Sequence, residues 1–307
     1  MVQKMKETLD DKITLTQKRI DLPRNGVIEK IALLFDVTLS NSGASDATIT
    51  YEDVLKAIEE IRVVADANDI KFSLNGLDVA IMNYYDSAAK SVDPAGSITV
   101  PAGGSTSVQF LLFLSGGIGE IHALAKENLV LSVNFNTSIS TDVGISAAEV
   151  TVTLDKKVFD DANEWIQYYE GVFIEPKVWT KEASFDQLNE LADVMNLPTG
   201  AIAWRGFIVG FDASSARANV INKYAIIQTK PRRTELLKVD WTTGQQLDKV
   251  EYALDSPLTG VTVIDYDKEL VPGGFDLREA ESGLFKLALK TGAAGRVRYI
   301  SHEMVIL

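Results

Sequence analysis

Apolar and polar residues alternate along several stretches of this chain with the two-residue period of a β-strand that has one buried face. The longest example runs from Val27 to Leu39, where most odd positions are apolar and most even ones are polar or small. The same period recurs over residues 108–114, 129–135 and 150–154. Clusters of Gly, Asn, Ser and Pro separate these stretches, as at residues 41–45. Short strands separated in this way predict a β-sandwich or a β-barrel.

Three short segments have helical spacing instead. They are residues 54–61, 77–85 and 188–195, and the last is preceded by Ser184 and Gln187 in the arrangement of a capping box. We interpret their apolar stripes as core contacts of short helices between the strands, not as segments that bind a cofactor.

The two halves of the chain repeat each other in order. Four pairs of segments correspond: Leu22-Pro23 with Leu197-Pro198, Phe35-Asp36 with Phe211-Asp212, Leu77-Asp78 with Leu247-Asp248, and Val100-Pro101 with Val271-Pro272. Each pair is weak alone, but all four follow one another at a nearly constant offset. This predicts a duplicated β-domain: an all-β fold of two tandem antiparallel jelly rolls with short helices in the connections.

Charge and cysteine content narrow the function classes. The net charge is -13, and a protein that coats nucleic acid needs a dense basic surface, so we expect no direct contact with nucleic acid. The basic group Lys230, Arg232 and Arg233 is interpreted as a solvated turn. There are no cysteines, which excludes disulfides and thiolate chemistry. The N-terminal residues lack the apolar core of a signal peptide and no run is long enough to span a bilayer, so a soluble chain is expected.

Motifs of enzymatic chemistry do not stand out. The two histidines, His122 and His302, form no metal-binding pattern, and each is interpreted as a lone surface or interface residue. The acidic residues suggest no particular catalytic pair, and the loop Asp66–Asp69 is interpreted as a solvated turn because EF-hand spacing is not met. We therefore assign no catalytic, cofactor-binding or metal-binding residue, and we expect no cofactor, no small-molecule substrate and no enzymatic activity.

Aromatic residues gather where the second half begins, at Trp165, Tyr168, Tyr169 and Phe173. Exposed, they would suit a carbohydrate-binding platform. Burial between the two jelly rolls or at a subunit contact is favoured, because aromatic side chains dominate core and interface energetics.

The segments Ile20–Ile31 and Tyr51–Val63 resemble the opening strands of the double jelly-roll major capsid proteins. That lineage includes tectiviruses, adenoviruses and tailless, membrane-containing viruses of bacteria and archaea. The resemblance is clearest over Ile13–Leu114, and the duplication extends it to the second half.

The resemblance implies a structural role. Such proteins form homotrimers in which six jelly rolls make a pseudo-hexameric capsomer, and the capsomers tile an icosahedral shell over an internal membrane. The implied partners are other copies of the chain, minor capsid or vertex proteins and the inner viral membrane. The implied location is the virion capsid, after assembly in the host cytoplasm. Residues 1–11 are expected to form an N-terminal arm, residues 12–159 the first jelly roll and residues 160–307 the second.

Two other classes of function remain open at this point. One is a glycan-binding or glycan-cleaving protein on a duplicated β-sandwich, and the other is a different assembly protein, such as a vertex or tail component. The fold alone does not choose among them, because jelly rolls have many functions.

Overall fold

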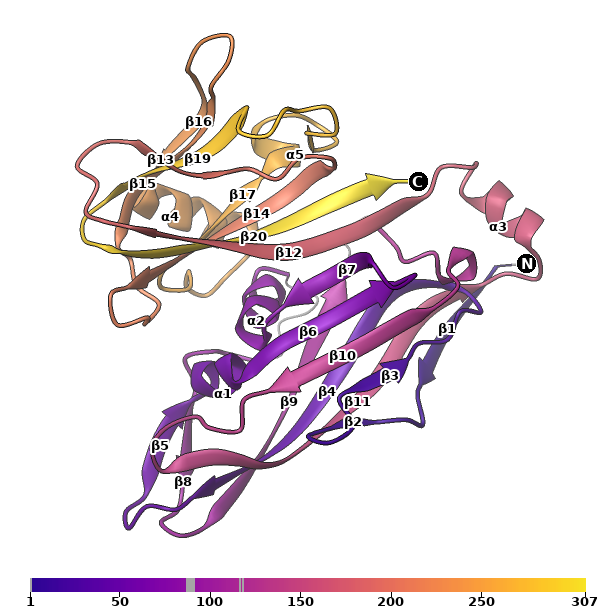
Figure 1. Cartoon of the computed structure of the whole chain (residues 1–307), viewed down its shortest axis with the longest axis vertical. Helices are drawn as coiled ribbons and strands as arrows, with labels where there is room; N and C mark the ends of the chain where they lie inside the picture. The colour runs from indigo at the N-terminus through magenta and orange to yellow at the C-terminus, as the bar shows by residue number, and fades with distance from the viewer. Residues whose placement is uncertain (1, 87–91, 116, 118) are drawn as a thin grey trace. The chain divides into compact units, whose positions relative to one another are not determined.

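The structure is a computed structural model that describes residues 2–86, 92–115, 117 and 119–307. Its internal contacts divide the chain into two compact units, whose elements are labelled in Figure 1. The first unit comprises Met1–Pro176 together with Ile306–Leu307, and the second comprises Lys177–Val305. Strands dominate both units, and the prediction of an all-β chain is confirmed.

The first unit is built on two antiparallel sheets. One has the strand order β1-β11-β4-β9, and the other has the order β3-β10-β6-β7. The bounds are β1 (Gln3–Thr8), β3 (Arg19–Asp21), β4 (Val27–Asn41), β6 (Ile58–Ala65), β7 (Asp69–Leu74), β9 (Ser105–Ser115), β10 (Leu129–Phe135) and β11 (Val143–Val158). A short strand, β2 (Ile13–Thr14), also pairs with β11.

Helices and a small ribbon form the connections of the first unit. They are β5 (Ala47–Thr50) paired with β8 (Ser97–Val100), α1 (Tyr51–Ala57), α2 (Gly76–Tyr84), the single-turn η1 (Ala123–Ala125) and α3 (Ala162–Tyr168). Thr50 begins α1 through a reciprocal capping box with Asp53, and the side chain of Asn75 caps α2. These caps satisfy backbone N–H groups that a first helical turn leaves unpaired, so short helices are stable here.

The core of the first unit lies between its two sheets. On β4 the odd residues from Ile31 to Leu39 are all buried, as the alternation predicts. The ring of Phe35 stacks on Phe110 of the neighbouring strand β9, with centroids 5.1 Å apart. It also contacts Phe135 of the opposite sheet edge-on at 6.2 Å, so one side chain joins both layers.

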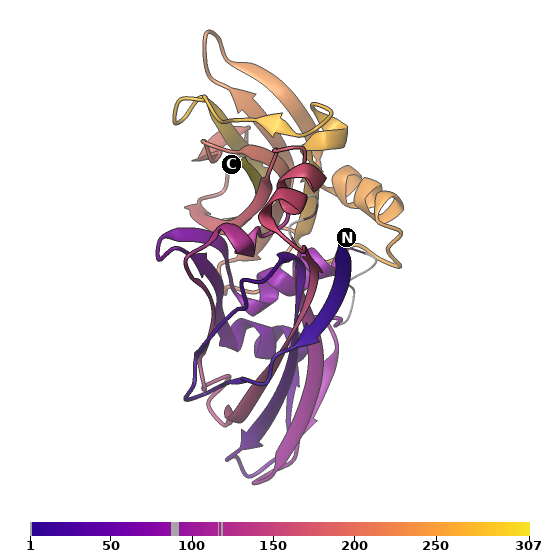
Figure 2. The ribbon, with the colours of Figure 1, turned by 90° about the vertical axis from the view of Figure 1, so that its right-hand side faces the viewer.

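Strand β1 occupies most of residues 1–11, the predicted N-terminal arm. It pairs with β11 over its whole length, from Gln3 opposite Val158 to Thr8 opposite Thr153. It ends its sheet, and Figure 2 shows it running down from the N-terminus along that edge. Lys6 lies 3.5 Å from Asp155 of β11.

The second unit repeats this architecture. Its two sheets have the strand orders β12-β20-β14-β17 and β13-β19-β15-β16. The bounds are β12 (Ile174–Phe185), β13 (Ala192–Asn196), β14 (Ile202–Asp212), β15 (Ile221–Gln228), β16 (Thr234–Asp240), β17 (Val261–Asp265), β19 (Phe285–Thr291) and β20 (Gly295–Ile306). The connections contain α4 (Trp241–Glu251), α5 (Tyr266–Glu269) and the short strand β18 (Phe275–Asp276), which pairs with β14. Residues of both sheets share one core, among them Ile208, Ile226, Leu287 and Tyr299.

The strand orders of the two units correspond one to one, which is the arrangement expected of two jelly rolls. Three of the four sequence pairs also lie at equivalent points of the two units. The Leu-Pro pairs precede β4 and β14, the Phe-Asp pairs lie within these strands, and the Leu-Asp pairs lie in helices α2 and α4. The fourth pair does not. Val100-Pro101 precedes β9, whereas Val271-Pro272 follows β17, the strand equivalent to β9. The duplication is therefore visible in the topology, and one of its four sequence markers was a coincidence of turn composition.

Two of the three helix predictions need correction. The helix predicted over residues 54–61 ends at Ala57, and Ile58 and Ile61 lie on β6, where they face β10. No helix forms at residues 188–195: Ala192–Asn196 is strand β13, paired with β19. Pairing with a neighbouring strand outweighs local helical spacing at both places. The helix predicted over residues 77–85 is α2.

Candidate functional site

The segment that follows β11, residues 160–176, folds back onto the first unit, and we call it the strap. It contains α3, which Asp161 caps by accepting a hydrogen bond from the backbone N–H of Glu164 at 2.8 Å. Its inner side supplies three aromatic rings, Trp165, Tyr169 and Phe173, which surround the buried ring of His122 with centroid distances of 4.7–5.9 Å. Burial of these aromatic rings holds the strap in place.

His122 is neutral in this setting. The Trp165 indole N–H donates to His122 Nδ1 at 3.1 Å, so this nitrogen serves as an acceptor. Burial lowers the pKa of His122 to about 4 despite the neighbouring carboxylates Glu175 and Glu120. Each histidine is predicted to be a surface or interface residue, and the surface position is wrong for both, since His122 and His302 are both buried.

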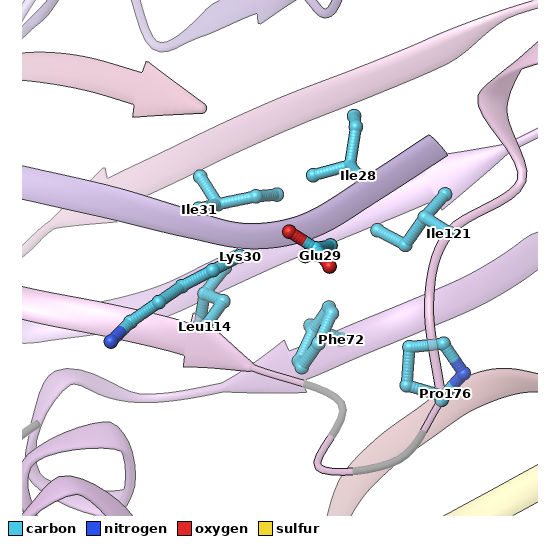
Figure 3. Close-up of a pocket in the computed structure, with 9 residues that line it drawn as sticks. Ile28, Glu29, Lys30, Ile31, Phe72, Leu114, Ile121 and Pro176 are labelled. Atoms are coloured by element: carbon cyan, nitrogen blue, oxygen red, sulfur yellow. The ribbon is translucent and has the colours of Figure 1, made fainter. Parts of the chain in front are cut away.

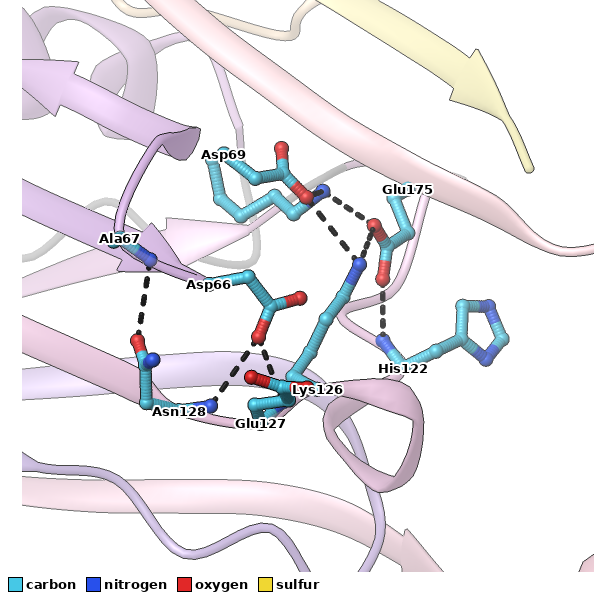
Figure 4. A network of polar contacts seen from close by, with 9 residues as sticks. Asp66, Ala67, Asp69, His122, Lys126, Glu127, Asn128 and Glu175 are labelled. Atoms are coloured by element: carbon cyan, nitrogen blue, oxygen red, sulfur yellow. Dashed lines mark hydrogen bonds and ion pairs between the residues drawn. The ribbon is translucent and has the colours of Figure 1, made fainter.

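A buried charge cluster lies beside His122 (Figure 4). Glu175, fully buried, forms ion pairs with Lys71 and with Lys126, the latter at 2.8 Å, and accepts a hydrogen bond from the backbone N–H of His122 at 3.1 Å. Asp69 lies 2.6 Å from Lys71 and 3.3 Å from Lys126. Two carboxylates and two ammonium groups thus balance, with Glu175 and both lysines buried and Asp69 at the solvent-exposed side of the cluster.

The pKa shifts in this cluster follow from that balance. Burial alone would lower the pKa of Lys126, but its hydrogen bonds and attraction to Glu175 and Asp69 outweigh burial and raise it. Burial alone would raise the pKa of Asp69, and the two lysines lower it instead. The charged forms of Lys126 and Asp69 are therefore stabilised by their partners in the cluster.

A second anchor of the strap involves Lys157 at the end of β11. Its ammonium contacts Glu120 at 2.6 Å and Glu29 at 3.1 Å, and the hydroxyl of Tyr169 donates to Glu120. Burial alone would lower the pKa of Lys157, but its contacts with these two carboxylates outweigh burial and raise it. Burial, reinforced by Glu120, raises the pKa of Tyr169. The strap is therefore fixed by an aromatic contact, a charge cluster and a tyrosine hydrogen bond, and none of these residue pairs is close in sequence.

Not all apolar side chains of the strap are covered by the first unit. Ile166, Tyr168 and Val172 are 45%, 48% and 52% exposed, and no residue of α3 is fully buried. Trp165, Tyr169 and Phe173 of the predicted aromatic cluster surround His122. Tyr168 is half exposed, and its ring packs edge-on against Phe159 and Tyr169, with centroids 5.6 Å and 4.9 Å apart. The aromatic cluster is visible in the sequence but its histidine is not, because His122 is distant in the chain.

Acidic groups gather in the second unit around α4. Asp248 is buried, and its Oδ2 accepts hydrogen bonds from the Thr262 hydroxyl at 2.8 Å and the Val263 N–H at 3.0 Å. Burial nevertheless raises the pKa of Asp248 to about 7. Burial also raises the pKa of Glu269 to about 7. These carboxyls dock α4 and α5 onto β17.

Two cavities of the described structure differ greatly in size. The pocket of Figure 3 lies between Glu29, Phe72 and Pro176 of the first unit and has a volume of about 10 Å³. That is room for about one water molecule. A larger hollow of about 620 Å³ lies open on the second unit beside Asp276 and Arg278, whose side chains pair with each other at 2.7 Å.

The other predicted features lie on the surface. Asp66 accepts hydrogen bonds from the backbone N–H groups of Glu127 and Asn128, which makes the loop at residues 66–69 a structural turn. Residues 230–233 form an exposed turn in which Arg233 pairs with Asp193 at 2.6 Å. Within residues 2–86, 92–115, 117 and 119–307, no group of three or more metal-ligating side chains is placed to hold an ion. No helix in the same residues has the length and apolar character that crossing a bilayer requires.

The two jelly rolls in one chain define a double jelly-roll fold, and solved structures of viral capsid proteins share it. No protein-family model and no curated protein sequence matches the chain. Among the solved structures, the STIV MCP is 22% identical with a TM-score of 0.88, over 99% of this chain and 97% of that one. A chain from the atomic structure of Sulfolobus Turreted Icosahedral Virus is 22% identical with a TM-score of 0.86, over 98% and 90%. The major capsid protein of bacteriophage PM2 is 11% identical with a TM-score of 0.60, over 99% and 98%. The fold therefore confirms the resemblance to double jelly-roll major capsid proteins that the sequence indicates.

Proposed function

We propose that this chain is a major capsid protein, a structural subunit of a virion and not an enzyme. The observation that supports this most strongly is the likeness to the STIV MCP, which spans nearly the whole of both chains. The matched region includes both jelly rolls. Because a match of this extent covers the organisation of the whole chain, the likeness is more than that of one common β-sandwich.

In this proposal the chain forms a homotrimer. Three chains with two jelly rolls each bring six similar domains around one axis, which gives a pseudo-hexameric capsomer that tiles an icosahedral shell. The two compact units, residues 1–176 with 306–307 and residues 177–305, supply the two jelly rolls of each subunit.

The further partners follow from the same proposal. Capsomers contact one another, minor capsid or vertex proteins, and an inner viral membrane, and the subunit passes through the host cytoplasm before it enters the virion. The net charge of -13 supports a shell that does not hold nucleic acid directly, because phosphates would be repelled.

The mass of the particle in solution tests this proposal. Light scattering coupled to size exclusion, at neutral pH and moderate salt, should give about 100 kDa, three times the chain mass of 33.6 kDa. Negative-stain images of that fraction should then show pseudo-hexagonal particles.

A monomer that persists over a wide range of protein concentration would contradict the trimer. In that case a glycan-binding protein becomes the alternative, and a glycan that binds the folded state should raise the melting temperature by mass action.

A further inference from the structure

We propose that helix α4 makes an autoinhibitory contact: its side chains keep the outer side of strand β17 from pairing with a second copy of the chain. They bond the backbone groups through which an added strand would pair. The inference concerns the second unit and holds whether or not the chain builds a shell.

Among the described strands, β17 ends its sheet, so one side of its backbone is turned away from β14. The backbone N–H of Gly210 on β14 donates to the carbonyl of Gly260 at 2.8 Å, just before β17 begins. Because backbone groups alternate along a strand, the even-numbered residues of β17 also pair with β14. Val261 and Val263 direct their backbone groups to the outer side.

Two side chains of α4 bond these outer groups. Gln245 Nε2 donates to the carbonyl of Val261 at 3.0 Å. The backbone N–H of Val263 donates to Asp248 Oδ2, also at 3.0 Å. Gln245 and Asp248 therefore make the bonds that the backbone of an added strand would make.

The composition of α4 fits this role. Gln245 and Asp248 are 6% and 4% exposed, and polar side chains are costly to bury unless they are hydrogen-bonded. Gly244 lowers the stability of the helix, but a Cβ at this position would lie 2.9 Å from Thr262 Oγ1. The glycine thus lets α4 approach β17 closely enough for its two polar side chains to reach the backbone.

The first unit contains the same kind of contact at the equivalent strand. Strand β9 ends its sheet as β17 does. Asn83 of α2 donates to the carbonyl of Phe113 at 2.9 Å and accepts from the N–H of the same residue at 2.7 Å. One side-chain amide here pairs with β9 as a neighbouring strand would. The contact therefore recurs at equivalent points of the two jelly rolls.

The covered strand is suited to pair with a copy of itself. Residues 261–264 are all β-branched and carry no charge, which is a composition with a high tendency to form strands. Every copy of the chain has this segment, and two uncovered segments can pair antiparallel about a twofold axis. A second copy is therefore the partner that α4 excludes.

The test uses the full-length protein and a fluorescently labelled peptide of residues 260–266, with binding followed by anisotropy. In the double variant Gln245→Ala with Asp248→Ala, buried backbone groups of β17 lose their partners, and α4 undocks more often. The apparent affinity for the peptide should rise in proportion to the undocked population, about tenfold or more over the wild type. The matched control Asp248→Asn retains an oxygen for the N–H of Val263 and should bind like the wild type.

A second peptide, N-methylated at Val263 and Ile264, separates strand pairing from apolar contact, because it lacks a backbone N–H on each side. It should not bind the double variant. Equal affinity of the wild type and the double variant for the first peptide would overturn the proposal. Equal binding of the methylated peptide would overturn it in favour of exposed apolar surface.

Circular dichroism checks that the variants are folded. If the double variant does not fold, native-state hydrogen exchange of the wild type decides. The Val263 amide should then exchange together with the amides of α4, at a lower opening free energy than the amides of β14. Exchange of Val263 only through global unfolding would contradict a releasable contact.

Discussion

Replacement of Glu175 by glutamine removes one negative charge from the centre of the buried cluster. Lys71 and Lys126, whose side chains are 3% and 6% exposed, would then share Asp69 as their only carboxylate in the cluster, and Asp69 is 42% exposed. Breaking a buried ion pair by removing one partner costs about 3–5 kcal/mol, because the remaining charge is uncompensated. For a unit of this size we expect the melting temperature of the first unit to fall by about 6–20 °C.

Guanidinium unfolding followed by tryptophan emission measures this effect. Trp165 lies in the first unit and the other tryptophans lie in the second, so a parallel series in a Trp165→Phe background separates the two transitions. The double variant Glu175→Gln with Lys126→Met retains one lysine opposite Asp69, and it should be more stable than Glu175→Gln alone.

Glu170→Gln is the matched control, because it removes an exposed carboxylate from the same strap and should change stability by less than about 0.5 kcal/mol. If Glu175→Gln were no more destabilising than this control, the charges of the cluster would not hold the strap. If the double variant were less stable than the single one, the reasoning from charge balance would be refuted.

Two further predictions concern the cores of the two units. The pKa of Asp248 is about 7 in the fold against 3.8 for an ordinary aspartate, so its contribution to stability is complete below about pH 4 and is lost as the pH rises through 7. The second unit should therefore gain about 2 kcal/mol between pH 8 and pH 5, and Asp248→Asn should remove that part of the pH dependence; an unchanged dependence would contradict the assignment. Phe35→Ala removes the ring that contacts both Phe110 and Phe135 and should destabilise the first unit by about 3–5 kcal/mol in guanidinium unfolding, whereas a loss below about 1 kcal/mol would contradict its central position.

The strands of the fold were predictable where one face is buried and the other is not. The alternation from Val27 to Leu39 identified β4 because its pairing neighbours leave one face for the core. The helix expected at residues 188–195 failed because those residues pair with β19, about a hundred residues away, and local spacing contains no information about that partner.

The candidate site could likewise be predicted only in part, because its contacts join residues that are distant in the sequence. Its aromatic residues were recognised from composition, but their arrangement around His122 depends on contacts across more than forty residues of chain. The cluster of Glu175, Lys71 and Lys126 gave no signal in the sequence at all. Isolated charged residues in a sequence are predicted to be exposed to solvent, and only the folded structure shows that these three are buried.

The edge strand β1 has a consequence for how the free protein behaves before it meets a partner. An open sheet edge is a template on which strands of other molecules can add, and this is a route to aggregation. Here the edge presents Lys4 and Lys6, both well exposed and held by Glu29 and Asp155 of the neighbouring strands. A strand that added there would have to bury or displace these charges, so we expect the chain to reach high concentrations without uncontrolled polymerisation through this edge.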